Sequence, residues 1–213
     1  MPSSSGTCLT PPLPDAAFLT ETLCNDSSAP DIAIAIPDGY KISRRDRING
    51  IGGGIAIVHK ATLEVHTHLD DTLKSAELMH FQIHTDPITT LRGTLIYRPP
   101  GPRALLSNAI ADLASTHTLA SMDYILLRDL NIHLENNNNV NSTTLIDNLA
   151  NLGLRQLVNA PTHATGHTLD HIFSTSNHIA FNRTTILYWT DHHCIHFTFM
   201  KQTKHHHTER PPC

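Results

Sequence analysis

The stretch from Tyr124 to His133 carries the residue types and spacing of a catalytic strand end. An apolar run of strand character ends in Asp129, and Asn131 follows two positions later. Residues i and i+2 of a strand face the same side, so the carboxylate and the carboxamide are expected to point into one cleft. This pair suits phosphate-ester chemistry, in which an acceptor orients water and a neutral donor holds the charge of the phosphate. Asp and Asn also start turns, and Asp-x-Asn alone fits a turn equally well.

Further polar residues stand at the ends of expected strands and lie far apart in the chain: Glu21, Tyr97, Asp170, Asp191 and His192. Carboxylates brought together repel one another unless a cation lies among them, and hard oxygen ligands favour Mg²⁺. Tyr97 and His192 can each donate a hydrogen bond to a phosphate oxygen. A neighbouring carboxylate can also hold a histidine ring in one tautomer. Spacing alone does not establish that these residues meet.

The apolar periodicity of the chain predicts many strands and two helices. Strands are expected at 16–22, 32–36, 76–84, 91–98, 124–129, 154–158, 168–173, 185–189 and 194–199. Apolar residues at i, i+4 and i+7 predict a helix from about 103 to 119, and a leucine stripe ending at Gly153 predicts a second helix. Strands with two helices between them predict an α/β sandwich with two facing sheets and helices outside.

The glycine run 52–54 resembles a phosphate loop only superficially. The Gly-Lys-Ser/Thr of a P-loop is missing, and no helix pattern follows the glycines. A glycine-rich entry into a strand that packs closely on its neighbour is the better interpretation. Glu77 is interpreted as an exposed charge at the start of a strand.

Composition places the chain among globular proteins. Its 213 residues suffice for one good core, and 39% hydrophobic with 16% charged residues excludes a disordered chain. The net charge is −4 and the pI is near 6.5, so any polyanion binding must come from a local patch or a metal. The best patch is Lys41 to Arg47, for which a solvated surface loop is an equally good interpretation.

The 17 histidines invite a zinc interpretation that their spacing does not support. His66 and His68 stand at i and i+2 of a possible strand, and a histidine tract lies at 205–207. The four cysteines are scattered with no pair at metal spacing, so structural zinc is disfavoured and reduced thiols in an intracellular setting are expected. The sequence shows no secretory signal, and no apolar run approaches the roughly 20 residues of a membrane span.

Six short motifs in order give a specific resemblance: FLTET, GGGIAIVHK, LIYRPPG, YILLRDLNIH, HTLDHIFS and TDHH. Together they resemble the endonuclease/exonuclease/phosphatase superfamily, and more narrowly the apurinic-type endonuclease domain of non-LTR (LINE-type) retrotransposons. The match extends from about Phe18 to Phe199. The resemblance implies a four-layer α/β sandwich with two facing mixed β-sheets and Mg²⁺-dependent hydrolysis of a DNA phosphodiester, with Mn²⁺ as a possible substitute.

The resemblance also implies a role for each motif residue. Glu21 and Asp191 would lie at the metal, and Tyr97 would hydrogen-bond the scissile phosphate. Asp129 would orient or deprotonate the attacking water. The other implied roles concern the phosphate: Asn131 and His192 would hold it, with Asp170 fixing the ring of His192.

Two departures from the family pattern bear on activity. A Pro/Ser leader, expected to be disordered over 1–14, stands where the family has a first strand and helix, so both are expected to be missing. The family's Gly-Asp-x-Asn reads Arg128-Asp129-Leu130-Asn131 here. Gly allows close backbone approach, whereas an arginine is expected to crowd the cleft or pair with Asp129.

These departures leave three functional hypotheses open. The first is a nicking endonuclease, in a truncated copy of the mobile element. The second is an impaired remnant that keeps the fold and weak nucleic-acid binding, and the third is a phosphatase of the same superfamily. The expected domain covers 15–200, with a polar tail at 201–213. DNA is the expected partner of a monomer that needs nuclear access, without a membrane or a small-molecule cofactor.

Overall fold

The computed structural model describes residues 13–25, 35–47, 52–99, 106–118, 123–129 and 140–200. Asn131 and His133 lie outside the described residues. So do most of the expected leader, most of the strand expected at 32–36, and the tail from 201.

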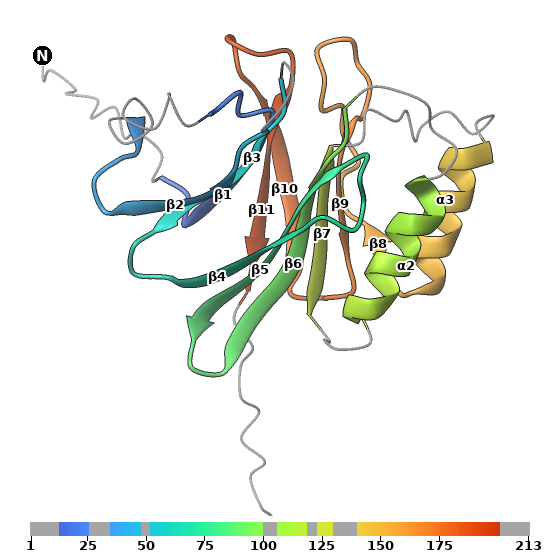
Figure 1. The fold of residues 1–213 in the computed structure, drawn as a ribbon, viewed down its shortest axis with the longest axis horizontal. Helices are drawn as coiled ribbons and strands as arrows, with labels where there is room; N and C mark the ends of the chain where they lie inside the picture. Colours follow the sequence, from blue (N-terminus) through green and yellow to red (C-terminus); the bar gives the residue numbers. More distant parts are fainter. Residues whose placement is uncertain are drawn as a thin grey trace, which may run out of the picture.

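Six strands form the main sheet, in the order β4–β5–β6–β7–β9–β8 (Figure 1). Their bounds are Glu64–Asp70 (β4), Glu77–Asp86 (β5), Thr89–Tyr97 (β6), Tyr124–Asp129 (β7), Arg155–Gln156 (β8) and Asp170–Ser174 (β9). The pair β6–β7 is parallel and the other pairs are antiparallel, so the sheet is mixed.

A second strand layer faces the main sheet. It consists of an antiparallel sheet in the order β1–β3–β2 and an antiparallel hairpin of β10 and β11. Their bounds are Ala16–Thr20 (β1), Tyr40–Arg45 (β2), Ile55–Lys60 (β3), Ile179–Ile186 (β10) and His193–Phe199 (β11). The rings of Phe18 and Phe197, with centroids 6.1 Å apart, join β1 to β11 across the gap between these two parts.

The two helices, α2 (Leu106–Thr118) and α3 (Val140–Asn151), pack side by side on the other face of the main sheet (Figure 1). The predicted α/β sandwich with two facing sheets is therefore confirmed, and both predicted helices are present. Gly153 ends α3 in the left-handed conformation (φ 77°), and Leu154 N donates to Leu149 O at 3.0 Å. This is the glycine cap that the sequence predicts. No helix in the described part of the chain has the length and apolar character needed to cross a membrane.

Strand β7 lies between two cores, one on each face. Tyr124 and Leu126 belong to the core under the helices, whereas Ile125 and Leu127 belong to the core between the strand layers. Successive strand residues point to opposite faces, so both faces of β7 must be apolar. For this reason the sequence reads as a continuous hydrophobic run with no polar alternation.

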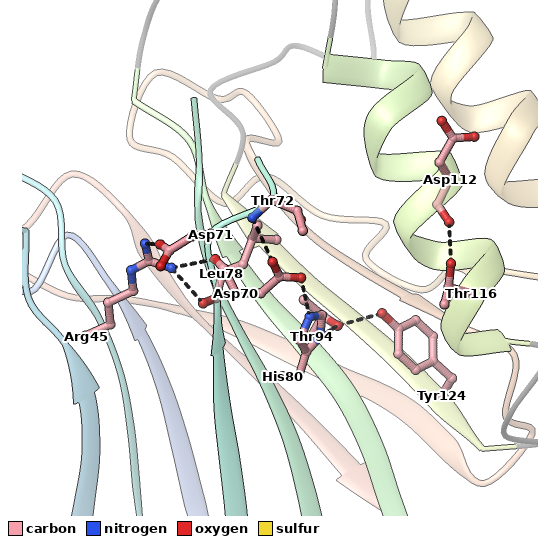
Figure 2. Close-up of polar contacts among 10 residues, drawn as sticks. All are labelled: Arg45, Asp70, Asp71, Thr72, Leu78, His80, Thr94, Asp112, Thr116 and Tyr124. Atoms are coloured by element: carbon pink, nitrogen blue, oxygen red, sulfur yellow. Dashed lines mark hydrogen bonds and ion pairs between the residues drawn. The ribbon is translucent and has the colours of Figure 1, made fainter. Parts of the chain in front are cut away.

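A chain of polar side chains crosses four adjacent strands on the helix-facing side (Figure 2). His80 Nε2 lies 2.9 Å from Asp70 Oδ2, His80 Nδ1 lies 2.7 Å from Thr94 Oγ1, and Thr94 Oγ1 lies 2.7 Å from the Tyr124 hydroxyl. Burial raises the pKa of Asp70, but hydrogen bonds from His80 and Thr72 outweigh it and hold this pKa at about 2. These bonds satisfy polar groups that the sheet buries and fix β4, β5, β6 and β7 side by side.

Two expectations from the sequence, one for a loop and one for a strand, are wrong. The segment 41–45 is not a loop but lies in β2, and Arg45 binds the Asp70 carbonyl (2.7 Å) and the Asp71 carboxylate (Figure 2). The strand predicted at 185–189 begins earlier, at Ile179, and ends at Ile186. Tyr188 and Trp189 are exposed (99% and 82%) after its end. Polar residues in the middle of β10 interrupt the apolar pattern on which the prediction relied.

Arg128 points away from the predicted cleft. Its guanidinium lies 4.4 Å from the centroid of the Phe173 ring, in the core under the helices, and its cross-strand neighbour is His171. Arg128 is 3% exposed, and burial lowers its pKa to about 9. None of its three side-chain nitrogens has a hydrogen-bond partner among the described residues. The expectation that Arg128 crowds the cleft or pairs with Asp129 is therefore wrong, because strand alternation puts the two side chains on opposite faces.

Replacing Arg128 with methionine is expected to raise the free energy of unfolding by about 1–3 kcal/mol, because a desolvated charge without hydrogen bonds gives way to an apolar side chain of similar length. Urea unfolding measures the change. Arg155→Met is the matched control, since Arg155 donates to Asn177 at 2.7 Å near the surface and its loss should not stabilise the chain. A lower urea midpoint for Arg128→Met would contradict this account.

Candidate active site

The register of β7 places Asp129 between two other predicted site residues. Asp129 pairs with Tyr97 of β6 on one side and with Asp170 of β9 on the other. Asp129 is 1% exposed and Tyr97 is 2% exposed. The charge of Asp129 contributes to the raised pKa of both Tyr97 and His192, so its carboxylate lies near both side chains. Three segments distant in sequence thus meet in the main sheet where β6 and β7 end and β9 begins.

The Asp170 carboxylate lies against the ring of His192. His192 Nδ1 donates to Asp170 Oδ2 at 2.8 Å. This hydrogen bond raises the pKa of His192 to about 9, against an opposing effect of burial and with help from the charges of Asp170, Asp129 and Asp191. His192 therefore carries both ring protons at neutral pH, which leaves Nε2–H as a donor for an anion.

An irregular loop at 160–168 braces this pair. Thr162 Oγ1 accepts from the backbone N–H groups of Leu169 (2.9 Å) and Asp170 (3.0 Å), which fixes the start of β9. His163 forms an isolated β-bridge with His192, and its Nε2 lies 3.2 Å from Asp191 Oδ2. The hydrogen bond from His163 lowers the pKa of Asp191. Sequence reasoning missed His163, because an irregular loop has no periodicity that would link it to a residue 28 positions away.

Glu21 follows β1 in a strained backbone conformation. It has φ 52° and Leu23 has φ 56°, values that non-glycine residues rarely adopt. Leu23 N donates to Gly53 O at 2.9 Å, and a side chain at Gly54 would collide with Thr22 Oγ1. The glycine run thus lets the two segments approach closely, as predicted, and this approach presents Glu21 to the Tyr97 hydroxyl, which donates to Glu21 Oε1.

Tyr97 stays a phenol at neutral pH. Burial, the hydrogen bond to Glu21 and the charge of Asp129 all raise its pKa. Arg47 lies beside it, with its guanidinium carbon 5.6 Å from the ring centroid. Arg47 Nε also donates to Glu77 Oε1 at 2.6 Å, and Gly54 N donates to Glu77 Oε2 at 2.7 Å. Glu77 is 8% exposed, so its interpretation as an exposed charge is wrong. Its double hydrogen bond offsets the cost of burial.

The six predicted site residues that the structure describes form a connected series. Its contacts run from Glu21 to Tyr97, Asp129, Asp170 and His192, and the backbone continues to Asp191. Carboxylate oxygens of Asp129 and Asp170 lie within 4.8 Å of a His192 ring nitrogen. Glu21 lies in none of the groups of three metal-ligating side chains found among the described residues. The roles of these residues, and of Asn131, stay predictions.

An open cleft of about 510 Å³ adjoins this series. Arg45, Arg47 and Lys74 line it together with Asp46, Glu77 and Pro99, which follows Tyr97 by two positions. Arg45 and Arg47 are paired with carboxylates. Lys74 is exposed and forms no ion pair with a described residue. The lining therefore carries three cations and two carboxylates, a small excess of positive charge near Tyr97.

No protein-family model and no curated protein matches the chain, but solved structures do. The endonuclease domain of TRAS1, a telomere-specific non-LTR retrotransposon, is 18% identical, with 76% of this chain and 79% of that one covered and a TM-score of 0.59. A 3′-5′ exonuclease (NExo) from Neisseria meningitidis is 15% identical, with 88% and 90% covered and a TM-score of 0.65. An endonuclease/exonuclease/phosphatase protein from Beutenbergia cavernae is 13% identical, with 84% and 61% covered and a TM-score of 0.57. The chain has the endonuclease/exonuclease/phosphatase fold.

The likeness confirms at the level of the fold what the six sequence motifs indicate. Strands β7 and β9, together with the turn before β11, are the parts of this endonuclease/exonuclease/phosphatase fold that carry Asp129, Asp170 and His192. TM-scores of 0.57–0.65 establish the fold, whereas identities of 13–18% leave the activity to be argued from the site.

Asp170→Asn is expected to lower the pKa of His192 from about 9 toward the ordinary 6.5. In the native chain, protonated His192 stabilises the fold fully below about pH 6.5, and this contribution is lost as the pH rises through about 9. Urea unfolding between pH 6 and 10 in EDTA measures that loss, and NMR titration of the ring measures the pKa. His193→Ala is the control. An unchanged titration of His192 in Asp170→Asn would refute the pairing.

Proposed function

We propose that this chain is a metal-dependent endonuclease domain of retrotransposon type, which hydrolyses a phosphodiester bond of target DNA. One observation carries the proposal. Five polar residues from distant parts of the chain form a connected series at the ends of the central strands: Glu21, Tyr97, Asp129, Asp170 and His192. The structural likeness to the TRAS1 endonuclease domain supports it. Cleavage of target DNA would require access to the nucleus.

Each side chain supplies a group that phosphodiester hydrolysis needs. Protonated His192 can donate Nε2–H to a nonbridging phosphate oxygen, and the negative charge that develops there in the transition state strengthens this bond. The phenol of Tyr97 can donate to the same phosphate when its single O–H exchanges Glu21 for the phosphate oxygen. Asp129 is the carboxylate between these two donors, where it can orient a water molecule for in-line attack and accept its proton.

A divalent cation fits the donor chemistry of the site. Glu21 and Asp191 are exposed carboxylates at its two ends, and hard oxygen donors favour Mg²⁺, with Mn²⁺ able to replace it. The cation would neutralise charge on the phosphate. The strained backbone at Glu21 supports a functional role, because strain of this kind persists mainly where a site requires it, although Leu23 has the same conformation.

In a plasmid-nicking assay with Mg²⁺, Asp129→Asn and His192→Ala are each expected to lower the rate of nicking by about 10²–10⁴-fold, since each removes a group that acts in the transition state. His193→Ala is the matched control. It removes the neighbouring imidazole, which lies 3.1 Å from the Pro161 carbonyl rather than on Asp170. Equal nicking by all three variants would reject the assigned site.

The cleft beside Tyr97 is proposed to hold the DNA backbone. Duplex DNA needs positive charge along its path, and a chain with a net charge of −4 must supply it locally. Lys74 is the lining cation with no ion pair among the described residues, so a phosphate can bind it without breaking an internal contact.

Lys74→Ala is expected to weaken binding to DNA of any sequence and to reduce the slope of log K against log salt concentration by about 1. Fluorescence anisotropy at several salt concentrations measures both quantities. The matched control is Lys60→Ala, because Lys60 pairs with Asp15 at 2.7 Å and does not line the cleft. A salt slope that stays unchanged in Lys74→Ala would remove Lys74 from the DNA path.

An impaired remnant is the competing candidate. Two observations at Glu21 favour it. The carboxylate accepts a hydrogen bond from the Tyr97 hydroxyl, and it belongs to none of the groups of three metal-ligating side chains among the described residues. Arg128 no longer favours it, because this side chain lies under the helices. DNA binding without nicking in either Mg²⁺ or Mn²⁺ would support the remnant. Turnover of a phosphomonoester without nicking would support a phosphatase.

A further inference from the structure

Histidine and glutamate side chains gather on one face of the β4–β5 hairpin, outside the candidate active site. Glu64 and His66 are two positions apart on β4 and therefore share a face. The antiparallel register sets His84 of β5 directly opposite Glu64 and diagonal to His66. Strand pairing thus brings together three potential ligands, a carboxylate and two imidazoles, from two segments that are separate in the sequence.

The geometry of this cluster matches a metal site. One ligand atom from each of the three side chains lies within 4.8 Å of the other two. His66 Nε2 donates to Glu64 Oε1 at 2.9 Å, and the rings of His66 and His84 are 5.7 Å apart in an edge-on arrangement. Bonds of about 2.0–2.1 Å to a tetrahedral ion put ligand atoms roughly 3.3 Å apart. Ligation therefore requires the three side chains to rotate until their ligand atoms, which lie within 4.8 Å of one another, reach that spacing.

A third strand orients one of the rings. Thr90 Oγ1 of β6 lies 2.9 Å from His84 Nδ1. Metal-binding histidines ordinarily use the second ring nitrogen in this way, which fixes the tautomer and the ring plane. With Nδ1 engaged by Thr90, Nε2 of His84 is the atom available for an ion.

We propose that Glu64, His66 and His84 bind a zinc ion that fastens strand β4 to β5. Two imidazoles with one carboxylate form a donor set that Zn²⁺ accepts and that Mg²⁺, which prefers oxygen ligands, does not. Water completes the coordination, because the cluster is exposed on one side. The ion would act on an edge strand, since β4 is the end of the main sheet.

The zinc cluster is separate from the catalytic residues. His84 lies seven residues along β5 from Glu77, which is roughly 23 Å at about 3.3 Å per residue. The other two groups of metal-ligating side chains in the described part of the chain both contain His192. Two further histidines of this face are not ligands: His80 is held by Asp70 and Thr94 (Figure 2), and His68 stacks on His80 with centroids 6.3 Å apart.

Zinc titration of the full chain against a competing chelator dye tests the proposal. His66→Ala and His84→Ala are each expected to lose one zinc ion per chain or to weaken that site by more than tenfold. Glu64→Gln is expected to weaken the site while keeping the side-chain size. Thr90→Val is expected to weaken it by about 10–100-fold, as for removal of other hydrogen bonds to metal ligands. The matched control is His68→Ala, which removes an imidazole from the same strand face and should keep the site.

Thermal unfolding gives a second readout, because a zinc ion that fastens β4 to β5 should stabilise the fold. Free zinc at about 100 times its Kd is expected to raise the Tm of the wild-type chain and of His68→Ala by about 5–10 °C. This rise should persist in His192→Ala, which separates the cluster from the candidate active site, and be absent in His84→Ala. The Tm of each variant in EDTA shows whether it still folds. Zinc binding by His84→Ala with the stoichiometry and affinity of the wild-type chain, or equal losses in His68→Ala and His84→Ala, would overturn the proposal.

Discussion

The position of β7 between a parallel and an antiparallel neighbour is the constraint on which the site depends. Its backbone register sets Asp129 opposite Tyr97 on one side and opposite Asp170 on the other. A shift of one residue would turn Asp129 toward the helices and Arg128 toward the site, since strand side chains alternate. The two apolar cores on either face of β7 hold this register, because each takes alternate residues of the strand. Catalytic geometry and core packing are therefore fixed by the same pairing.

Buried polar groups in this fold are supported by partners from other segments. Glu77 accepts hydrogen bonds from Arg47 and from the backbone of Gly54. These bonds tie the three-stranded sheet of β1, β3 and β2 to the main sheet. The chain from Asp70 to Tyr124 does the same across four strands. Arg128 is an exception, because all three of its side-chain nitrogens lack such a partner among the described residues. Its guanidinium lies over the Phe173 ring and has no hydrogen-bond partner among the described residues, so its burial lowers the stability of the fold.

Sequence reasoning succeeded where one periodicity dominates. The run at 124–129 and the leucine stripe ending at Gly153 predicted β7 and α3 because core burial dictates their patterns. It failed at β10, whose polar middle hides the strand, and at Glu77, whose burial depends on an arginine 30 positions away. Neither feature leaves a local signal, because the compensating group comes from another part of the fold.

The sequence by itself determined the fold class and the set of polar residues at strand ends, since apolar periodicity and motif order are local properties of the chain. Only the tertiary structure decided which of these residues meet, and on which side. Strand pairing turned Arg128 away from Asp129 and brought His84 against Glu64. A loop bridge from His163 to His192 accompanies the contact of His192 with Asp170. Register between distant strands follows from how two cores close, and no single segment contains that information.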